Sequence, residues 1–239
     1  MKPNFVLTVI FLFVVTIVGA QELSLDEILS KHFEALGLDQ IQKVNTITMK
    51  GTMVQQDAMP VKIVKMRPDK FLMEFDVQDI TAYQGYDGQT AWWTIPWTGH
   101  PEPQLMPEER AKDVRSKADF DGLFYKWKEK GHLVELMGRD TMENSIAFKL
   151  KLTKKDGGVE YYFMDVSRYL VLKRMYSRVA RGQETFIEIY FRDYRPVQGV
   201  MLAFAQDTFI GGQPYNSLQF DSIELNLPVD TQQFRMPVK

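Results

Sequence analysis

The residue types that most often perform catalysis or bind metals are few in this chain and widely spaced. There is no cysteine, which excludes thiol catalysis and cysteine-ligated metal. The three histidines, His32, His100 and His132, are scattered, and the sequence has no His-Glu-x-x-His, Gly-x-Ser-x-Gly or phosphate-loop motif. His32 falls on an apolar helical stripe, which favours a packed core histidine over a ligand. We expect no metal site and no cofactor.

Two carboxylates in "DFDG", Asp119 and Asp121, are the nearest this sequence comes to a catalytic pair. Such a pair could serve acid–base catalysis, but no other chemical signal accompanies it, and its spacing does not match a calcium-binding loop. We therefore expect no catalytic residues, and an enzyme stays the third of three functional hypotheses.

The first twenty residues predict export from the cytoplasm. Lys2 precedes a long apolar run that ends in small residues, so residues 1–20 resemble a signal peptide cleaved before Gln21. An uncleaved membrane anchor is the alternative, because the run is slightly long for a signal. Without Lys2 the formal net charge changes from −2 to −3, which argues against nucleic-acid binding. Without cysteine there is also no site for a lipid anchor.

The first element after this segment is a helix in "SLDEILSKHFEALG". Ser24 and Glu27 have the spacing of a capping box, and Gly37 is a natural stop. Leu25, Ile28, Leu29, His32, Phe33 and Leu36 form an apolar stripe between them. The helix is therefore expected to lie on an apolar surface.

Beyond residue 45 the hydrophobic period changes from 3.6 to 2, which is typical of strands. The Asp87-Gly88 and Asp156-Gly157 pairs are strong hairpin signals, so about ten antiparallel strands are expected. Residues 98–130 break this alternation. They are rich in proline and charge, and they predict a loop with one or two helices over the rim of the sheet. No linker divides the chain, so residues 21–239 are expected to form one domain.

A sheet this wide must curve, and two short helical regions cannot cover its concave face completely. The sequence therefore predicts a mainly β (α+β) fold, one wide curved antiparallel sheet that forms an unclosed half-barrel around an apolar cavity. A filled core is the alternative. Nine side chains are expected to line the cavity: Ile47, Met49, Met53, Val61, Ile63, Phe71, Met73, Phe75 and Trp92. Trp93 and Trp97 are instead assigned to the outer sheet face or to an insertion.

The segment "KMRPDKF", followed by "DGQTAWW", resembles the "RP…F…DG-T-W" pattern of the LolA-like periplasmic lipoprotein carriers. The "FRMP" near the end agrees, and "HFEALGLDQIQKVNTITMKGTM" is similar to the longer branch, the outer-membrane lipoprotein-sorting proteins. The resemblance implies a half-barrel of the LolA/LolB/RseB type, with helices as a lid over a cavity for acyl chains. It matches Arg67 to the arginine that latches the lid and Trp92 to the aromatic residue after "DG-T". The longer segment 98–130 departs from the compact carriers.

The leading hypothesis is therefore a periplasmic chaperone that carries lipoprotein acyl chains, or another lipid, towards the outer membrane of a Gram-negative bacterium. The resemblance implies an inner-membrane export complex and an outer-membrane acceptor as partners, with transient membrane contact, and a monomer is expected. The alternative is a periplasmic sensor of the same fold that detects lipid or binds an envelope-stress regulator.

Overall fold

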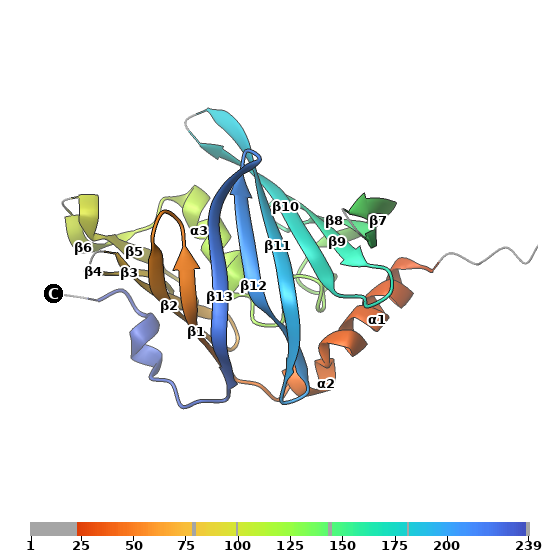
Figure 1. Cartoon of the computed structure of the whole chain (residues 1–239), viewed down its shortest axis with the longest axis horizontal. Helices are drawn as coiled ribbons and strands as arrows, with labels where there is room; N and C mark the ends of the chain where they lie inside the picture. The colour runs from red at the N-terminus through yellow and green to blue at the C-terminus, as the bar shows by residue number, and fades with distance from the viewer. Residues whose placement is uncertain (1–22, 78–79, 99, 143–144, 181, 238–239) are drawn as a thin grey trace, which may run out of the picture.

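A computed structural model describes residues 23–77, 80–98, 100–142, 145–180 and 182–237 (Figure 1). The expected signal peptide, residues 1–20, and its cleavage site before Gln21 lie outside the described residues. Within the described ranges, no helix is both long and apolar enough to cross a membrane.

One antiparallel sheet contains thirteen strands in the described chain. Their bounds are β1 Thr46–Val54, β2 Ala58–Met66, β3 Lys70–Val77, β4 Ile80–Tyr86, β5 Ala91–Ile95, β6 His100–Leu105, β7 Leu133–Met142, β8 Ser145–Thr153, β9 Val159–Asp165, β10 Val171–Ala180, β11 Gln183–Val197, β12 Val200–Ile210 and β13 Gln213–Leu225. Their order across the sheet is β6-β5-β4-β3-β2-β1-β13-β12-β11-β10-β9-β8-β7. The sheet is not closed, because β6 and β7 form its two edges. The predicted half-barrel is confirmed.

About ten strands are expected from the sequence, and the additional ones include both edges of the sheet. β6 lies in the segment expected to be loop and helix. Its sequence, "HPEPQL", contains Pro101 and Pro103, which an edge strand tolerates because it has a side without ladder hydrogen bonds. The two predicted Asp-Gly hairpins are confirmed, since Asp87-Gly88 joins β4 to β5 and Asp156-Gly157 joins β8 to β9.

Within the described residues, three α-helices and two 3-10 turns accompany the sheet: α1 Leu25–Leu36, α2 Leu38–Ile41, α3 Glu108–Ala118, η1 Pro96–Thr98 and η2 Thr231–Phe234. The predicted capping box of α1 is confirmed. The backbone N–H of Glu27 donates to the Ser24 hydroxyl over 3.3 Å, and the Ser24 N–H donates to the Glu27 carboxylate over 2.8 Å. Gly37 ends the helix in a left-handed conformation, with φ of 74°.

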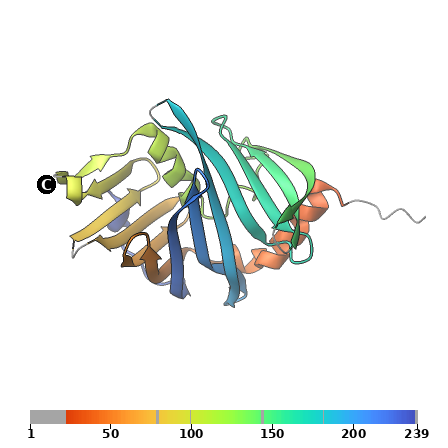
Figure 2. The ribbon, with the colours of Figure 1, turned by 45° about the horizontal axis from the view of Figure 1, so that its top comes forward.

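Helices α1 and α3 lie on the concave side of the sheet, towards its two ends (Figures 1 and 2). Each covers a separate apolar cluster. The α3 cluster comprises Val44, Met53, Met59, Val61, Ile63, Phe71, Met73, Tyr86, Ala91, Met106, Ala111, Val114, Ala118, Phe120, Val200, Phe204, Phe220, Ile223 and Leu225. The α1 cluster comprises Ile28, Leu29, Phe124, Val134, Phe148, Leu150, Leu152, Tyr162 and Met164. A small outer cluster, Val64, Leu72, Trp92 and Phe234, lies on the convex face.

Candidate functional site

Eight of the nine predicted cavity residues lie together on the concave face, in or against the α3 cluster. Strand register explains this, because Met49 is opposite Ile63 and Ile63 is opposite Met73 across β1, β2 and β3. Side chains opposite each other in a ladder point to the same face. Five are buried, namely Met53, Val61, Ile63, Phe71 and Met73, and three are partly buried, namely Ile47, Met49 and Phe75.

Trp92 is the exception, and its placement corrects the sequence-based expectation. It lies opposite Gly85, which in turn lies opposite Leu72, so all three belong to the convex face. Gly85 leaves room for the indole, since a Cβ there would lie 2.3 Å from the Trp92 ring. The indole N–H donates to the carbonyl oxygen of Phe234 over 2.7 Å. Trp93, expected to pack against the outer sheet face or an insertion, lies against the α3 cluster.

The cover of this surface comes from α3 and the residues around it. Ala111, Val114 and Ala118 lie on one helical face and are buried, whereas the other residues of α3 are charged except for Ser116. Met106 and Phe120, just outside the helix, complete the cover. Helix α3 itself lies over β3–β5, and Ile47 and Met49 of β1 stay partly exposed.

Arg67, the predicted latch, connects three segments at one end of the α3 cluster. Its guanidinium donates to the carbonyl oxygens of Val44 over 2.6 Å and Ile41 over 2.7 Å, and to the Asp121 carboxylate over 2.6 Å. The ring of Phe120 lies 4.4 Å from its Cζ. Arg67 is therefore placed to tie the strand end to the loop after α2 and to the segment after α3.

The other chemically notable residues of the sequence have structural partners. The Asp119 carboxylate accepts from Lys130 over 2.6 Å, and Asp121 is paired with Arg67, so both carboxylates are held in ion pairs. His32 is buried, and its Nδ1 donates to the carbonyl oxygen of Tyr169 over 2.6 Å. Burial lowers the pKa of His32, as expected of a core histidine.

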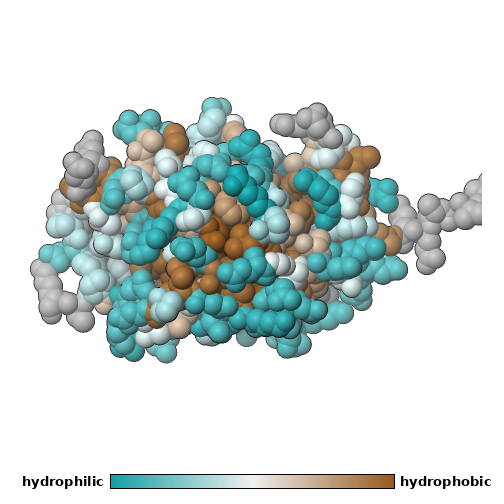
Figure 3. Space-filling model, turned by 60° about the horizontal axis from the view of Figure 1, so that its bottom comes forward, coloured by the Kyte–Doolittle hydropathy of each residue, from teal (hydrophilic) through white to brown (hydrophobic). Residues whose placement is uncertain are grey.

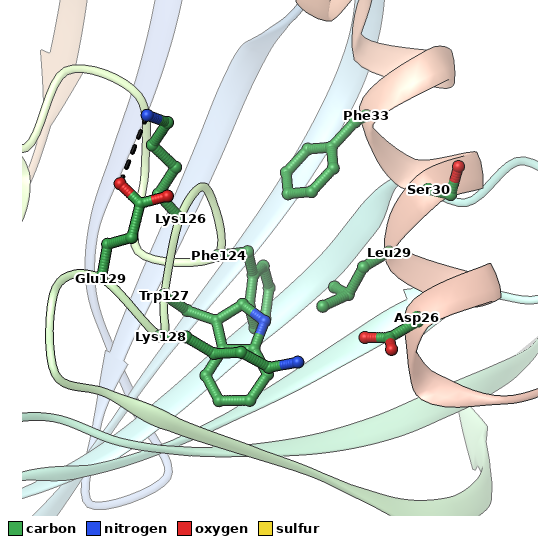
Figure 4. Close-up of a pocket in the computed structure, with 9 residues that line it drawn as sticks. All are labelled: Asp26, Leu29, Ser30, Phe33, Phe124, Lys126, Trp127, Lys128 and Glu129. Carbon is green, nitrogen blue, oxygen red and sulfur yellow. Dashed lines mark ion pairs between the residues drawn. The ribbon is translucent and has the colours of Figure 1, made fainter.

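A groove between α1 and residues 124–129 was not predicted (Figure 4). Its volume is about 370 Å³, and Leu29, Phe33, Phe124 and Trp127 supply its apolar lining. Lys126, with other charged residues, borders it and pairs with Glu129 over 3.3 Å. The sequence separates its two walls by about ninety residues, so only the fold brings them together.

A buried polar network lies on the concave face, between the two apolar clusters. Arg174 donates to both oxygens of the Glu160 carboxylate, over 2.7 and 2.9 Å. Lys154 and the Tyr162 hydroxyl lie 3.0 and 2.7 Å from the same carboxylate. Burial alone would raise the pKa of Glu160, but Arg174, Lys154 and Tyr162 together lower it to about 2. The network therefore holds a charged carboxylate inside the protein.

The fold defined by this sheet and its covering helices is LolA-like. A DUF1329 family protein from Desulfovibrio piger aligns with a TM-score of 0.61 at 11% identity, over 87% of this chain and 97% of that chain. A LolA superfamily protein from Nitrosomonas europaea aligns with a TM-score of 0.58 at 12% identity, over 90% and 98%. A putative outer membrane lipoprotein-sorting protein domain from Vibrio parahaemolyticus gives 0.55 at 14% identity, over 84% and 95%. No model of a known protein family and no curated protein matches the sequence.

Proposed function

We propose that this protein is a periplasmic binding protein that carries lipoprotein acyl chains, or another lipid, on the concave face of its sheet. The observation that carries the proposal is the α3 cluster. Strands β1–β3 present a continuous apolar surface, and α3, which lies over β3–β5, adds only three small buried side chains to its cover, Ala111, Val114 and Ala118. An apolar ligand could replace this cover at little loss of contact, because the surface beneath it is already apolar.

The side chains of this surface suit an acyl chain. Met49, Met53, Met59 and Met73 are unbranched and flexible, so they adapt to a chain of variable shape. Each methylene group that leaves water contributes about 0.8 kcal/mol. Transfer of several methylene groups therefore gives micromolar binding even after the cost of association.

Apolar side chains also reach the surface of the protein. In Figure 3 they gather in the middle of the face turned towards the viewer, with hydrophilic side chains around them. Apolar patches with a polar border are typical of binding surfaces. The patch supports a role in which the protein contacts an apolar ligand or a membrane for short periods.

The proposal includes the remaining expectations from the sequence. The chain is exported by residues 1–20, works as a single domain and monomer in the periplasm of a Gram-negative bacterium, and needs no cofactor. It receives its cargo from an inner-membrane export complex and delivers it to an outer-membrane acceptor. Arg67 acts as the latch that holds α3 and the segment after it closed.

Titration of the delipidated protein with a fluorescent fatty-acyl probe tests this function. Met49→Gln changes the partly buried concave lining, and Lys50→Gln is its matched control on the next, exposed position of β1. We expect saturable binding by the wild type and by Lys50→Gln, and binding about 5- to 30-fold weaker by Met49→Gln, because about 1–2 kcal/mol of apolar contact is lost.

Melting temperatures measured alongside show whether each variant is folded. A folded wild type without saturable binding would contradict the proposed function. Lipid extraction and mass spectrometry of the protein purified from its own periplasm would then identify the natural cargo.

A further inference from the structure

Lys65 places an amine on the concave face at one end of the α3 cluster. Strand β2 points Lys65 to the same face as Ile63, and the register sets it between Ile47 of β1 and Phe71 of β3. An amine in this position is unusual, because its neighbours on both sides are apolar. The apolar surface therefore has one cationic end.

The segment after α3 occupies this cationic end. Phe120 is buried in the α3 cluster, with its ring 5.7 Å from the Lys65 amine. The Lys65 amine donates to the carbonyl oxygen of Asp119 over 3.0 Å. The Phe120 ring and the Asp119 carbonyl oxygen thus occupy the site. The first carbons of an amphiphile could take the place of the ring, and its head group could take the place of the oxygen acceptor.

Lys65 and Arg67 differ in how fully the protein satisfies them. Arg67 makes hydrogen bonds to three acceptors from two segments, the end of α2 with its following loop and the segment after α3. Across the described ranges, the only hydrogen bond of the Lys65 amine goes to a neutral main-chain carbonyl, while the Asp119 carboxylate turns to Lys130. Lys65 therefore keeps donors for another acceptor and has no carboxylate of its own within these ranges, whereas Arg67 is already paired with the Asp121 carboxylate.

The electrostatic environment of Lys65 agrees with this geometry. Burial is the main cause that lowers the pKa of the Lys65 amine to about 8. Among the charged groups that face the amine, Asp119 and Asp121 oppose this shift. Lys130 and Arg67 add to it. The cation is thus poorly compensated in the closed form, and an anion would stabilise it.

We infer that Lys65 binds the anionic head group of an amphiphile, a carboxylate or a phosphate, whose apolar chain lies in the α3 cluster. The ligand displaces Asp119 and Phe120, which occupy the site in the closed form. This inference rests on the proposed function and adds a preference for anionic lipid. It assigns Lys65 a binding role that is separate from the latch role of Arg67.

Three fluorescent probes with the same chain distinguish the possibilities: a fatty acid, its methyl ester and the corresponding alkyl phosphate. Each is titrated at pH 7 into delipidated wild type, Lys65→Met and Lys62→Met. Lys62 is the matched control, because it lies on the same strand but on the convex face, paired with Glu74. Methionine keeps the length of lysine and suits the apolar neighbours, so we expect both variants to fold.

We expect the wild type and Lys62→Met to bind at least one of the anionic probes about tenfold or more tightly than the ester. In Lys65→Met this preference is lost, while ester binding is unchanged or tighter. The anion that shows the preference identifies the head group. Lys65→Arg, which keeps the charge, should retain part of the preference.

Two results would overturn the inference in different ways. Equal binding of ester and anions by the wild type removes the anionic preference but leaves the proposed function intact. If Lys65→Met keeps the full preference, the role of Lys65 in that preference fails, and the proposed function again stays intact. If none of the probes binds to folded wild type, the proposed function itself fails, and the role of Lys65 fails with it.

Discussion

Helices α1 and α3 cover two ends of the same concave face, and the contacts that hold them differ in kind. Helix α1 has a complete capping box and buries Ile28, Leu29 and His32 in the α1 cluster. Helix α3 has no side-chain cap among the described residues and buries only two alanines and one valine. Apolar contact therefore fixes α1, whereas α3 has a small apolar face.

Polar contacts help to hold α3 in place, in addition to its small apolar face. Asp113 pairs with Arg178 over 3.3 Å, and the Lys154 amine donates to the Ser116 hydroxyl over 3.2 Å. Arg67 holds the segment that follows the helix. These contacts are polar and only partly buried, so water could replace them if α3 moved, whereas water could not replace apolar contacts. Apolar contacts therefore hold the cover at the α1 end of the face, whereas polar contacts supply part of the hold at the α3 end.

The largest expected effect concerns the polar network to which α3 is tethered. Glu160→Gln removes the charge that Arg174 and Lys154 share, and it leaves two buried cations without compensation. We expect a loss of about 3–5 kcal/mol in the free energy of unfolding, measured by urea denaturation. Glu135→Gln, in the exposed pair with Lys151, is the control and should cost at most about 1 kcal/mol.

The same network predicts how stability depends on pH. The pKa of Glu160 is lower in the folded protein than in the unfolded chain, so the unfolded chain binds more protons at acidic pH. Its contribution is present above the unfolded pKa of about 4.5 and is lost as the pH falls towards about 2. Acid unfolding of Glu160→Gln should lack this component, and an unchanged acid profile would contradict the assignment.

Truncation of one buried side chain in each cover gives the next largest effect. Ile28→Ala in α1 should cost about 2–5 kcal/mol, because it leaves a cavity in a fixed core. Val114→Ala in α3 should cost only about 1–2 kcal/mol, since it removes two methyl groups from a cover with few contacts. Urea denaturation of both variants tests this. Equal losses would mean that α3 is as much a part of the core as α1.

The sequence predicted local features of the fold better than features that depend on contacts between distant segments. Ser24 and Glu27 define α1 locally, and strict alternation defines most strands, so these features need no knowledge of distant contacts. The face on which Trp92 lies depends on its pairing with Gly85, and two adjacent tryptophans give no clear period. The partners of Glu160 come from neighbouring strands and a turn, which only the assembled register brings together.

Release of the latch should have an intermediate effect and should act only on the α3 end. Arg67→Leu removes charge-assisted hydrogen bonds to three acceptors in two segments, so we expect a loss of about 1.5–3 kcal/mol at this end. Hydrogen exchange should become faster in α3 and residues 119–121 and stay unchanged in α1. Lys151→Leu, which breaks a partly exposed pair with Glu135 between β8 and β7, is the control. Unchanged hydrogen exchange in α3 would mean that Arg67 does not act as a latch.

The smallest expected effect is the most direct test of a removable cover. If ligand binds only when α3 is displaced, the closed form lowers the apparent affinity by the fraction of molecules that are open. Val114→Ala weakens the cover by about 1 kcal/mol, so it should raise the affinity for the fatty-acyl probe about fivefold. Ile28→Val is the control for α1, and it should lower stability without raising affinity. If both variants change affinity equally, or Val114→Ala weakens binding, the side chains of α3 are part of the binding surface and the cover does not open.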